Sequence, residues 1–233
     1  MTACMKLDLP RIEATLQEFQ DPVYSGSPAG AVREPLEAET IGNMVKGYRC
    51  IERFVNEGTD IFAMGGSKHL LELNRIVLCG IEMDRRRENA GHLAATERRF
   101  YEEPGAGIGD LIDWYRLNSS APVWDLAAGV YMRILGTPQL YIEGNHRTGA
   151  LVASYLLMRV AEPPFVLTRD NAADYFAASG DIRVIRKHSL RASFQFPGLL
   201  RRLAAFLRRE ANPAFLQAAH PTDCANPRGL MSS

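Results

Sequence analysis

The sequence has few of the features that mark secreted, metal-stabilised or membrane-spanning proteins. Its 233 residues include only four cysteines, which are far apart and form no CxxC pair. This spacing argues against a zinc site or a disulfide framework and favours a reducing compartment. The first residues, MTACMKLDLPRIEA, lack the apolar segment of a signal peptide, and no run reaches the ~18 apolar residues of a membrane span. We therefore expect a cytoplasmic protein without a membrane span.

An excess of charge of either sign is also missing. Lys plus Arg and Asp plus Glu each total 27, so the formal net charge is zero. Proteins that bind nucleic acid usually carry a basic excess, so we rank nucleic acid last among partners. Basic clusters at residues 183–191 and 201–209 are interpreted as solvated helix faces, with contact to phosphate or membrane as the alternative. Binding of nucleic acid through the C-terminal arginines would show a steep salt dependence.

Signals for β-strands are few, and apolar residues recur with helical spacing at 37–56. We expect a mainly helical class, with residues 82–101 as either helix or short hairpin. The predicted organisation is an N-terminal helical extension at 1–80 packed on a core at 81–211, followed by a mobile tail at 212–233. The expected helices cover residues 7–19, 37–56, 67–79, 109–117, 121–135, a segment from the turn near 145 to 160, and 198–210.

One polar turn stands directly before an apolar helix, in the segment YIEGNHRTGALVASYLL at 141–157. A helix N-terminus has unpaired backbone N–H groups and a partial positive charge, which together favour anions. Gly144 lets the backbone approach a ligand closely, and Asn145 can hold the turn by side-chain hydrogen bonds. Arg147 offers donors suited to phosphate oxygens, and Thr148 can bind phosphate or cap the helix. Glu143 is a hard oxygen ligand that would hold Mg²⁺ beside a polyphosphate.

The segment resembles the core motif of the Fic/Doc (Fido) superfamily. That motif reads H-x-F-x-[DE]-G-N-G-R-x-x-R in Fic proteins and ends more like N-K-R-T in Doc proteins. The resemblance covers roughly residues 85–170, including the helix-loop-helix at 109–135. The matching positions are Tyr141, Glu143, Gly144, Asn145 and Arg147.

The resemblance implies an all-α, Fido-like helical bundle with one short β-hairpin flap, placed at residues 90–101. It implies a nucleotide such as ATP, or another phosphate-containing ligand, bound at the 139–150 loop with Mg²⁺ on Glu143. The phosphate-binding residues would be Gly144, Asn145, His146, Arg147, Thr148 and Gly149. It further implies transfer of AMP or a phosphoryl group to a hydroxyl of a protein target, which the flap would align by strand addition.

Three positions depart from the motif. The catalytic His of the family aligns with Gln139, which cannot act as a base, and loss of a general base typically costs ~10²–10⁴ in rate. The second motif Gly is His146, which either imitates the Lys of Doc-like sequences or fills the site. The final motif Arg is Ala150, as in Doc-like sequences, so a partner for a γ-phosphate is missing.

Two hypotheses follow from these departures. The first is a divergent Fic/Doc-like nucleotidyltransferase or phosphotransferase without the usual general base. Gln139 stands at its catalytic position, and His146 is the other residue considered for catalysis. The second is a catalytically inactive Fido-fold interaction module. An open cleft lined by Arg147 would favour ligand binding, and a His146 side chain packed across the cleft would favour the module.

Overall fold

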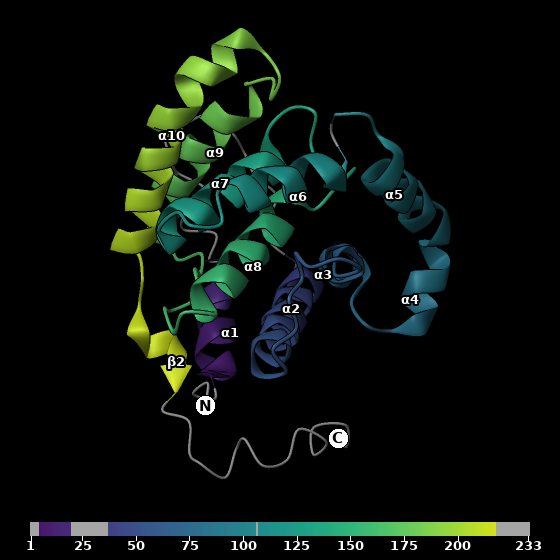
Figure 1. Cartoon of the computed structure of the whole chain (residues 1–233). Helices are drawn as coiled ribbons and strands as arrows, with labels where there is room; N and C mark the ends of the chain where they lie inside the picture. Colours follow the sequence, from purple (N-terminus) through teal and green to yellow (C-terminus); the bar gives the residue numbers. More distant parts are fainter. Residues whose placement is uncertain (1–4, 20–36, 106, 218–233) are drawn as a thin grey trace.

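A computed structural model of the chain describes residues 5–19, 37–105 and 107–217, and of residues 191–193 it describes the backbone alone. Within these ranges the protein is mainly helical, as predicted, with one small antiparallel sheet (Figure 1). The elements are β1 (Lys6–Leu7), α1 (Leu9–Glu18), α2 (Ala38–Asn56), α3 (Ser67–Cys79), α4 (Met83–Glu88), α5 (Ala90–Glu102), α6 (Ile108–Leu117), α7 (Val123–Leu135), α8 (Asn145–Met158), α9 (Ala172–Arg183), α10 (Leu190–Arg209), the 3-10 turn η2 (Pro213–Phe215) and β2 (Leu216–Gln217).

Helix α8 lies at the centre of the molecule and contacts α7, α2 and α3 (Figure 1). Every residue from Thr148 to Met158 is buried, because a helix that is apolar on all faces must be covered on all faces. Gly149 and Gly47 let the neighbours come close. A Cβ added to Gly149 would lie 2.9 Å from Cδ2 of Tyr131, and a Cβ added to Gly47 would lie 2.4 Å from Cδ1 of Leu151. The start of α8 is therefore held in a fixed position by three other helices.

The N-terminal helices share one hydrophobic core with the rest of the described chain. α2 and α3 contact α8 directly, and a single cluster of buried side chains extends from Leu7 to Phe215. The described residues of the expected extension at 1–80 contribute side chains to this cluster. α2 and α3 thus form part of the wall around the start of α8.

The predicted hairpin flap at 90–101 is wrong, because these residues form helix α5. Leu93, Thr96 and Phe100 are its buried residues, and their spacing of three and four matches one face of a helix rather than an alternating strand. Residues 82–101, for which helix and hairpin were both open, are helical in α4 and α5. The described chain has a small antiparallel sheet elsewhere, between β1 and β2, which are far apart in the sequence and form no hairpin.

Two further helices differ from the prediction. α9 was not predicted, since its buried residues are Ala172, Tyr175, Ser179 and Ile182, a stripe that is mostly small or polar. α10 begins at Leu190 rather than at 198, with Pro197 inside the helix. The other predicted helices are confirmed to within two residues at most ends.

The two ends of the described chain are joined. Lys6 pairs with Gln217 and Leu7 with Leu216, and the N–H of Asp8 donates to the carbonyl of Phe215 at 2.9 Å. In Figure 1, β2 lies beside α1. Residues 213–217 of the predicted mobile tail are therefore anchored, whereas residues 218–233 lie outside the described part.

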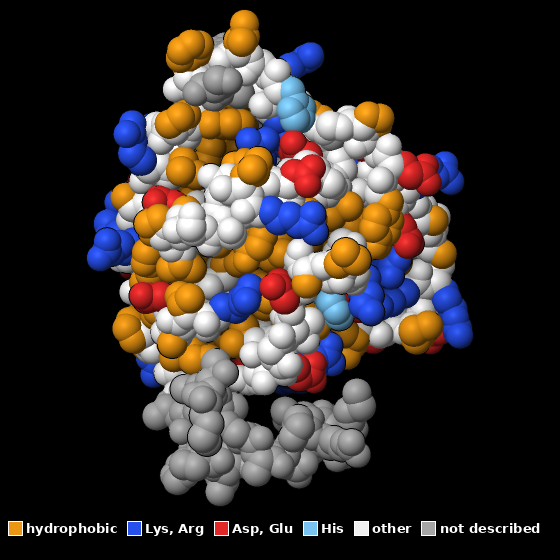
Figure 2. All heavy atoms as spheres, in the orientation of Figure 1, with side chains coloured by type: hydrophobic (Ala, Val, Ile, Leu, Met, Phe, Trp, Pro, Cys, Tyr) orange, Lys and Arg blue, Asp and Glu red, His pale blue; other side chains and the backbone are white. Residues whose placement is uncertain are grey.

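Charges of both signs are interspersed on the face of the molecule shown in Figure 2. Hydrophobic side chains are spread over much of this face (Figure 2). Near the end formed by α9 and α10, the exposed apolar residues are Val184, Leu190 and Phe194. Among the helices of the described ranges, none combines the length and apolar character that a membrane crossing requires.

Candidate functional site

The turn before α8 is shaped by Gly144, the N-cap residue of the helix. Its φ of 75° lies in the left-handed region, where residues with a Cβ are strained. An added Cβ would also lie 3.0 Å from Nδ2 of Asn74 on α3. Asn74 Nδ2 donates to the carbonyl of Glu143 at 2.9 Å and to Oγ1 of Thr148 at 3.0 Å. Gly144 thus allows α3 to hold both sides of the turn.

Asn145 closes the loop that precedes the helix. Its Oδ1 accepts from the N–H of Tyr141 at 2.9 Å, and its Nδ2 donates to the carbonyl of Tyr141 at 2.9 Å and to Oε1 of Gln139 at 3.1 Å. Asn145 is buried, so these bonds satisfy groups that water does not reach. The prediction that Asn145 holds the turn through its side chain is confirmed.

The N–H groups of Gly144, Asn145 and Arg147 at the start of α8 remain available. The ladder of the helix begins with the bond from the Thr148 N–H to the carbonyl of Gly144 at 2.9 Å. Within the described residues, the N–H groups of Ile142, Gly144, Asn145 and Arg147 donate to no protein group. No side chain caps the helix either. This helix start is therefore able to accept an anion.

The Gln139 side chain is hydrogen-bonded to Asn145, the first residue of α8. Because the Tyr141 N–H fixes Oδ1 of Asn145 as the acceptor, Nδ2 of Asn145 must donate, and Gln139 must present its oxygen to it. The amide nitrogen of Gln139 then faces the other way. The carbonyl of Gln139 accepts from Nε and Nη2 of Arg99 at 3.1 and 2.9 Å, which ties the loop to α5.

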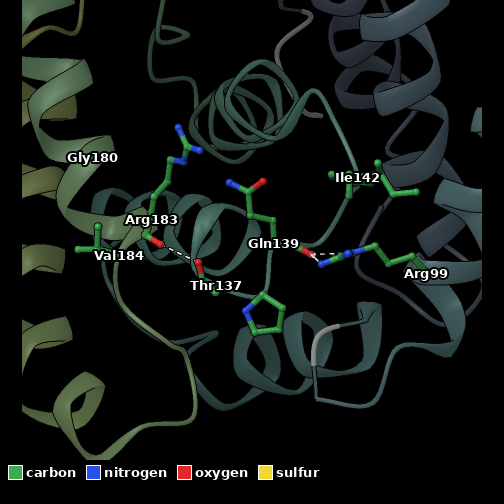
Figure 3. Close-up of a pocket in the computed structure, with 9 residues that line it drawn as sticks. Arg99, Thr137, Gln139, Ile142, Gly180, Arg183 and Val184 are labelled. Atoms are coloured by element: carbon green, nitrogen blue, oxygen red, sulfur yellow. Dashed lines mark hydrogen bonds between the residues drawn. The ribbon is translucent and has the colours of Figure 1, made fainter. Parts of the chain in front are cut away.

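A cavity of about 650 Å³ opens beside Gln139. Figure 3 shows the Gln139 side chain between Arg183, which comes from α9, and Arg99, which comes from α5. The residues that line the cavity are Arg99, Thr137, Pro138, Gln139, Tyr141, Ile142, Gly180, Arg183 and Val184, and none of them is acidic. The volume lies within the range of small-molecule sites, roughly 300–1,000 Å³.

Arg147 points toward α3 rather than into this cavity. Its Nη1 donates to the carbonyl of Val77 at 3.2 Å, in the last turn of α3. Burial lowers the pKa of the Arg147 guanidinium, and the carboxylate of Glu143 partly offsets this. A cation is favourable at a helix C-terminus, so Arg147 stabilises the contact between α8 and α3. An open cleft lined by Arg147 was expected to favour ligand binding. Arg147 is not among the residues that line the cavity beside Gln139.

His146 packs on the opposite side, among aromatic residues of α7 and α9. Its Nδ1 lies 3.1 Å from the hydroxyl of Tyr131, and its ring is within 6.5 Å of the rings of Tyr131, Tyr175 and Phe176. The hydroxyl of Tyr175 donates to the His146 carbonyl at 3.3 Å. His146 does not line the cavity beside Gln139.

Glu143 is exposed and faces α5. Its Oε2 lies 3.9 Å from Nε2 of His92, a nitrogen that is buried without a hydrogen-bond partner in the described structure. Among the described residues, no group of three His, Cys, Asp or Glu side chains is placed to hold a metal ion. A single carboxylate suits Mg²⁺ only where phosphate oxygens and water complete the coordination, which is the role expected for Glu143.

Thr148 and Gly149 face the protein interior. Thr148 has an exposed fraction of 0% and its hydroxyl accepts from Asn74, while Gly149 packs against Tyr131. Of the predicted site residues, the structure therefore brings together Gln139, Gly144 and Asn145 at one loop. Glu143 and Arg147 project toward α5 and α3, and His146 toward α7 and α9.

Sequence reasoning missed Asn74, Arg99 and Arg183. They belong to α3, α5 and α9, and no motif in the sequence connects them with the loop. Only the basic stretch at 183–191 gave a hint, and the interpretation preferred there was a solvated face. The fold, rather than spacing along the chain, brings Arg99 and Arg183 to the cavity.

No protein-family model matches the chain, and no curated protein matches it. Among solved structures, it is similar to a Fic-domain-containing signalling protein from Bacteroides thetaiotaomicron, with 14% identity over 88% of this chain and 89% of that one and a TM-score of 0.46. It is also similar to Fic-1 from C. elegans in two structures, with 17% and 18% identity over 87% of this chain and TM-scores of 0.40. The chain spans 60% and 59% of those two Fic-1 chains. Because all three TM-scores are below 0.5, we draw no functional conclusion from them.

Proposed function

We propose that this protein is a divergent member of the Fic/Doc superfamily that binds a nucleotide, or another phosphate-containing ligand, where the loop 139–144 meets α8. The observation that carries the proposal is that the N–H groups of Gly144, Asn145 and Arg147 at this helix start donate to no group of the described protein. The loop is held open by Asn145 from within and by Asn74 from α3. A site fixed before the ligand arrives needs little reorganisation when the ligand binds.

The position of Gln139 supports binding with little or no group transfer. Its oxygen accepts from Asn145, and an amide does not take up a proton near neutral pH. A hydroxyl entering this site would find no general base on Gln139, a loss of ~10²–10⁴ in rate. We therefore propose that any transfer of AMP or a phosphoryl group to a protein hydroxyl is slow.

Neither His146 nor His92 offers a replacement base in this arrangement. His146 is directed into the aromatic cluster of α7 and α9. His92 approaches Glu143, whereas Arg99, seven residues later on α5, approaches Gln139. Seven residues of helix rise about 10 Å, so the backbone of His92 lies about two turns of α5 away from that of Arg99.

Glu143 is the residue that would hold Mg²⁺ when a nucleotide is bound. Its carboxylate is exposed and lies directly before Gly144. The ion would neutralise charge on the phosphates, which is its usual contribution in nucleotide sites. This chain contributes one carboxylate, so binding of Mg²⁺ is proposed to depend on the nucleotide.

A protein target would not dock by strand addition at residues 90–102. Strand addition needs an exposed sheet edge with unpaired backbone groups, and this segment is helix α5. A target would instead contact side chains around the cavity, where Ile142 and Val184 are exposed apolar residues.

The second candidate is an interaction module without catalysis. The packing of His146 against Tyr131, Tyr175 and Phe176 favours it, since the ring serves to join three helices. In this reading the loop is a structural remnant, and nucleotides would not bind at all. Nucleotide binding therefore separates the two candidates.

The test compares nucleotide binding and transfer in matched variants. By calorimetry, wild type is expected to bind ADP and ATP, and Gly144→Ala to weaken binding at least tenfold, because the left-handed turn is lost. Gly42→Ala in α2 is the control, since an added Cβ there meets nothing within 4 Å. With labelled ATP, wild type is expected to label protein targets weakly and Gln139→His more strongly. Absence of nucleotide binding at millimolar concentration contradicts the proposal, and robust labelling by wild type contradicts the slow transfer.

A further inference from the structure

The cavity beside Gln139 presents hydrogen-bond donors from two helices and one loop. Arg99 reaches it from α5, Arg183 from the C-terminal end of α9, and Gln139 lies between them (Figure 3). No carboxylate among the lining residues neutralises the two guanidinium groups. Such a lining favours an anion and disfavours a cation.

Arg99 is fixed in place before any ligand arrives. Its Nε and Nη2 donate to the carbonyl of Gln139, and its side chain is half-buried. A guanidinium has five N–H donors, so these bonds leave others for a ligand. The backbone contact thus orients Arg99 without using its capacity.

The Gln139 amide nitrogen is the second donor. Asn145 takes its oxygen, and this assignment follows from the backbone groups of Tyr141 that fix Asn145. The nitrogen makes no hydrogen bond within the described structure. Gln139 therefore suits an oxygen acceptor, which is the opposite of the role that a basic histidine would have there.

Arg183 is the adjustable partner. Its carbonyl accepts from Oγ1 of Thr137 at 2.6 Å, which anchors its backbone to the loop. Its guanidinium is exposed and forms no ion pair or hydrogen bond with the described residues. Because its backbone is anchored and its guanidinium is unpaired, the Arg183 side chain can turn toward a ligand without losing other contacts.

We propose that Arg99, Gln139 and Arg183 bind the terminal phosphate of a nucleoside di- or triphosphate, while the preceding phosphate lies at the start of α8. This inference rests on the proposed function for the second of these positions. The bond between Asn145 and Gln139, 3.1 Å long, makes the two positions adjacent. In this arrangement Arg183 recognises the number of phosphates, and Arg147, which is bonded to α3, does not.

The experiment measures phosphate-number preference by calorimetry at fixed ionic strength, with inorganic phosphate, pyrophosphate, AMP and ADP as probes. Wild type is expected to bind ADP at least tenfold more tightly than AMP, and pyrophosphate more tightly than phosphate. Arg183→Gln is expected to abolish the preference, with the affinity for ADP reduced to that for AMP. Arg116→Gln, at an exposed arginine on α6, is the matched control and should keep the preference. Since the Arg183 side chain has no partners within the described structure, its replacement should leave the fold intact.

The outcomes separate this inference from the proposed function. A preference that survives in Arg183→Gln and disappears in Arg147→Gln overturns the inference and leaves the proposed function standing. Pyrophosphate binding that needs Arg183 but is unaffected by Gly144→Ala keeps the cavity site and removes the helix start from the account. Binding of a phosphorylated peptide without binding of pyrophosphate overturns the inference, because the occupant would then be a protein.

Discussion

At the scale of single residues, the loop before α8 depends on two buried asparagines. Asn145 serves the backbone of Tyr141 from inside the loop, and Asn74 serves the carbonyl of Glu143 from α3. Together their side-chain amides donate to the carbonyls of Tyr141 and Glu143. The N–H groups of Gly144, Asn145 and Arg147 at the helix start remain available for a ligand.

The free energy of unfolding is predicted to depend on pH through a single residue, Lys187. Its side chain is buried, and burial lowers its pKa from 10.5 to about 8, although Asp110 partly opposes the shift. Between these values the folded protein binds fewer protons than the unfolded chain, so the free energy of unfolding rises with pH. Below pH 8 the buried charge costs up to about 3 kcal/mol.

Replacing Lys187 with Met removes that charge and keeps the unbranched shape. Lys187→Met is expected to raise the free energy of unfolding near pH 7 by up to about 3 kcal/mol, with a much smaller gain at pH 10. Urea unfolding at the two pH values measures the effect, with Lys68→Met at an exposed position of α3 as the control. An equal gain at both values would contradict the assignment.

The motif predicts the role of some single residues in the loop but not the direction of others. The holding role of Asn145 was predictable, because an asparagine side chain in a turn has few other uses. The direction of Arg147 was not, because it depends on the carbonyl of Val77, seventy positions away along the chain. Arg99 and Arg183 were not predictable as site residues for the same reason.

At the scale of elements, the position of the site depends on how closely α7 and α8 approach. Gly149 faces the ring of Tyr131, and an added Cβ would lie 2.9 Å from Cδ2. Neither the buried ring nor the helix backbone can yield easily in a packed interior. The site at the start of α8 is therefore sensitive to changes at this contact.

Gly149→Ala is expected to reduce stability by about 1–3 kcal/mol, the usual cost of overpacking a core. The matched control is Gly91→Ala on α5, where an added Cβ meets nothing within 4 Å. Because alanine favours helix over glycine, the control should gain up to about 1 kcal/mol. Thermal unfolding of the two variants measures the difference, and equal shifts would show that the α7–α8 contact is looser than described.

Helical periodicity predicted α2, whose buried face is mainly apolar. It failed for α9, where Ala172 and Ser179 are buried without being strongly hydrophobic. The flap was predicted from the resemblance rather than from the residues, and the spacing of Leu93 and Phe100 favoured a helix.

At the scale of the whole molecule, the described chain is joined at its ends and organised around one core. Phe215 is buried, and its carbonyl accepts from Asp8 next to β1. The contact connects the last described segment with α1, which packs on α2, and α2 in turn contacts α8. Stability at the ends should therefore be coupled to stability at the site.

Phe215→Ala is expected to reduce the free energy of unfolding by about 3–5 kcal/mol, as for other buried aromatic residues. Because one cluster includes Leu7 and Phe215, the variant should still unfold in a single transition. Denaturant titration followed by fluorescence and circular dichroism measures both properties. A separate early transition would indicate that the terminal segments form an independent layer.

The central proposal is that backbone N–H groups at the start of α8 donate hydrogen bonds to a bound anion. The most direct measurement is an NMR titration of the amide signals with ADP, with Asn145 and Arg147 as reporters and Leu156, a buried residue in the last turn of α8, as the reference. We predict saturable shifts at Asn145 and Arg147, at the same ADP concentrations as calorimetric binding, with little change at Leu156. Binding of ADP that leaves the Asn145 and Arg147 signals in place would contradict the account.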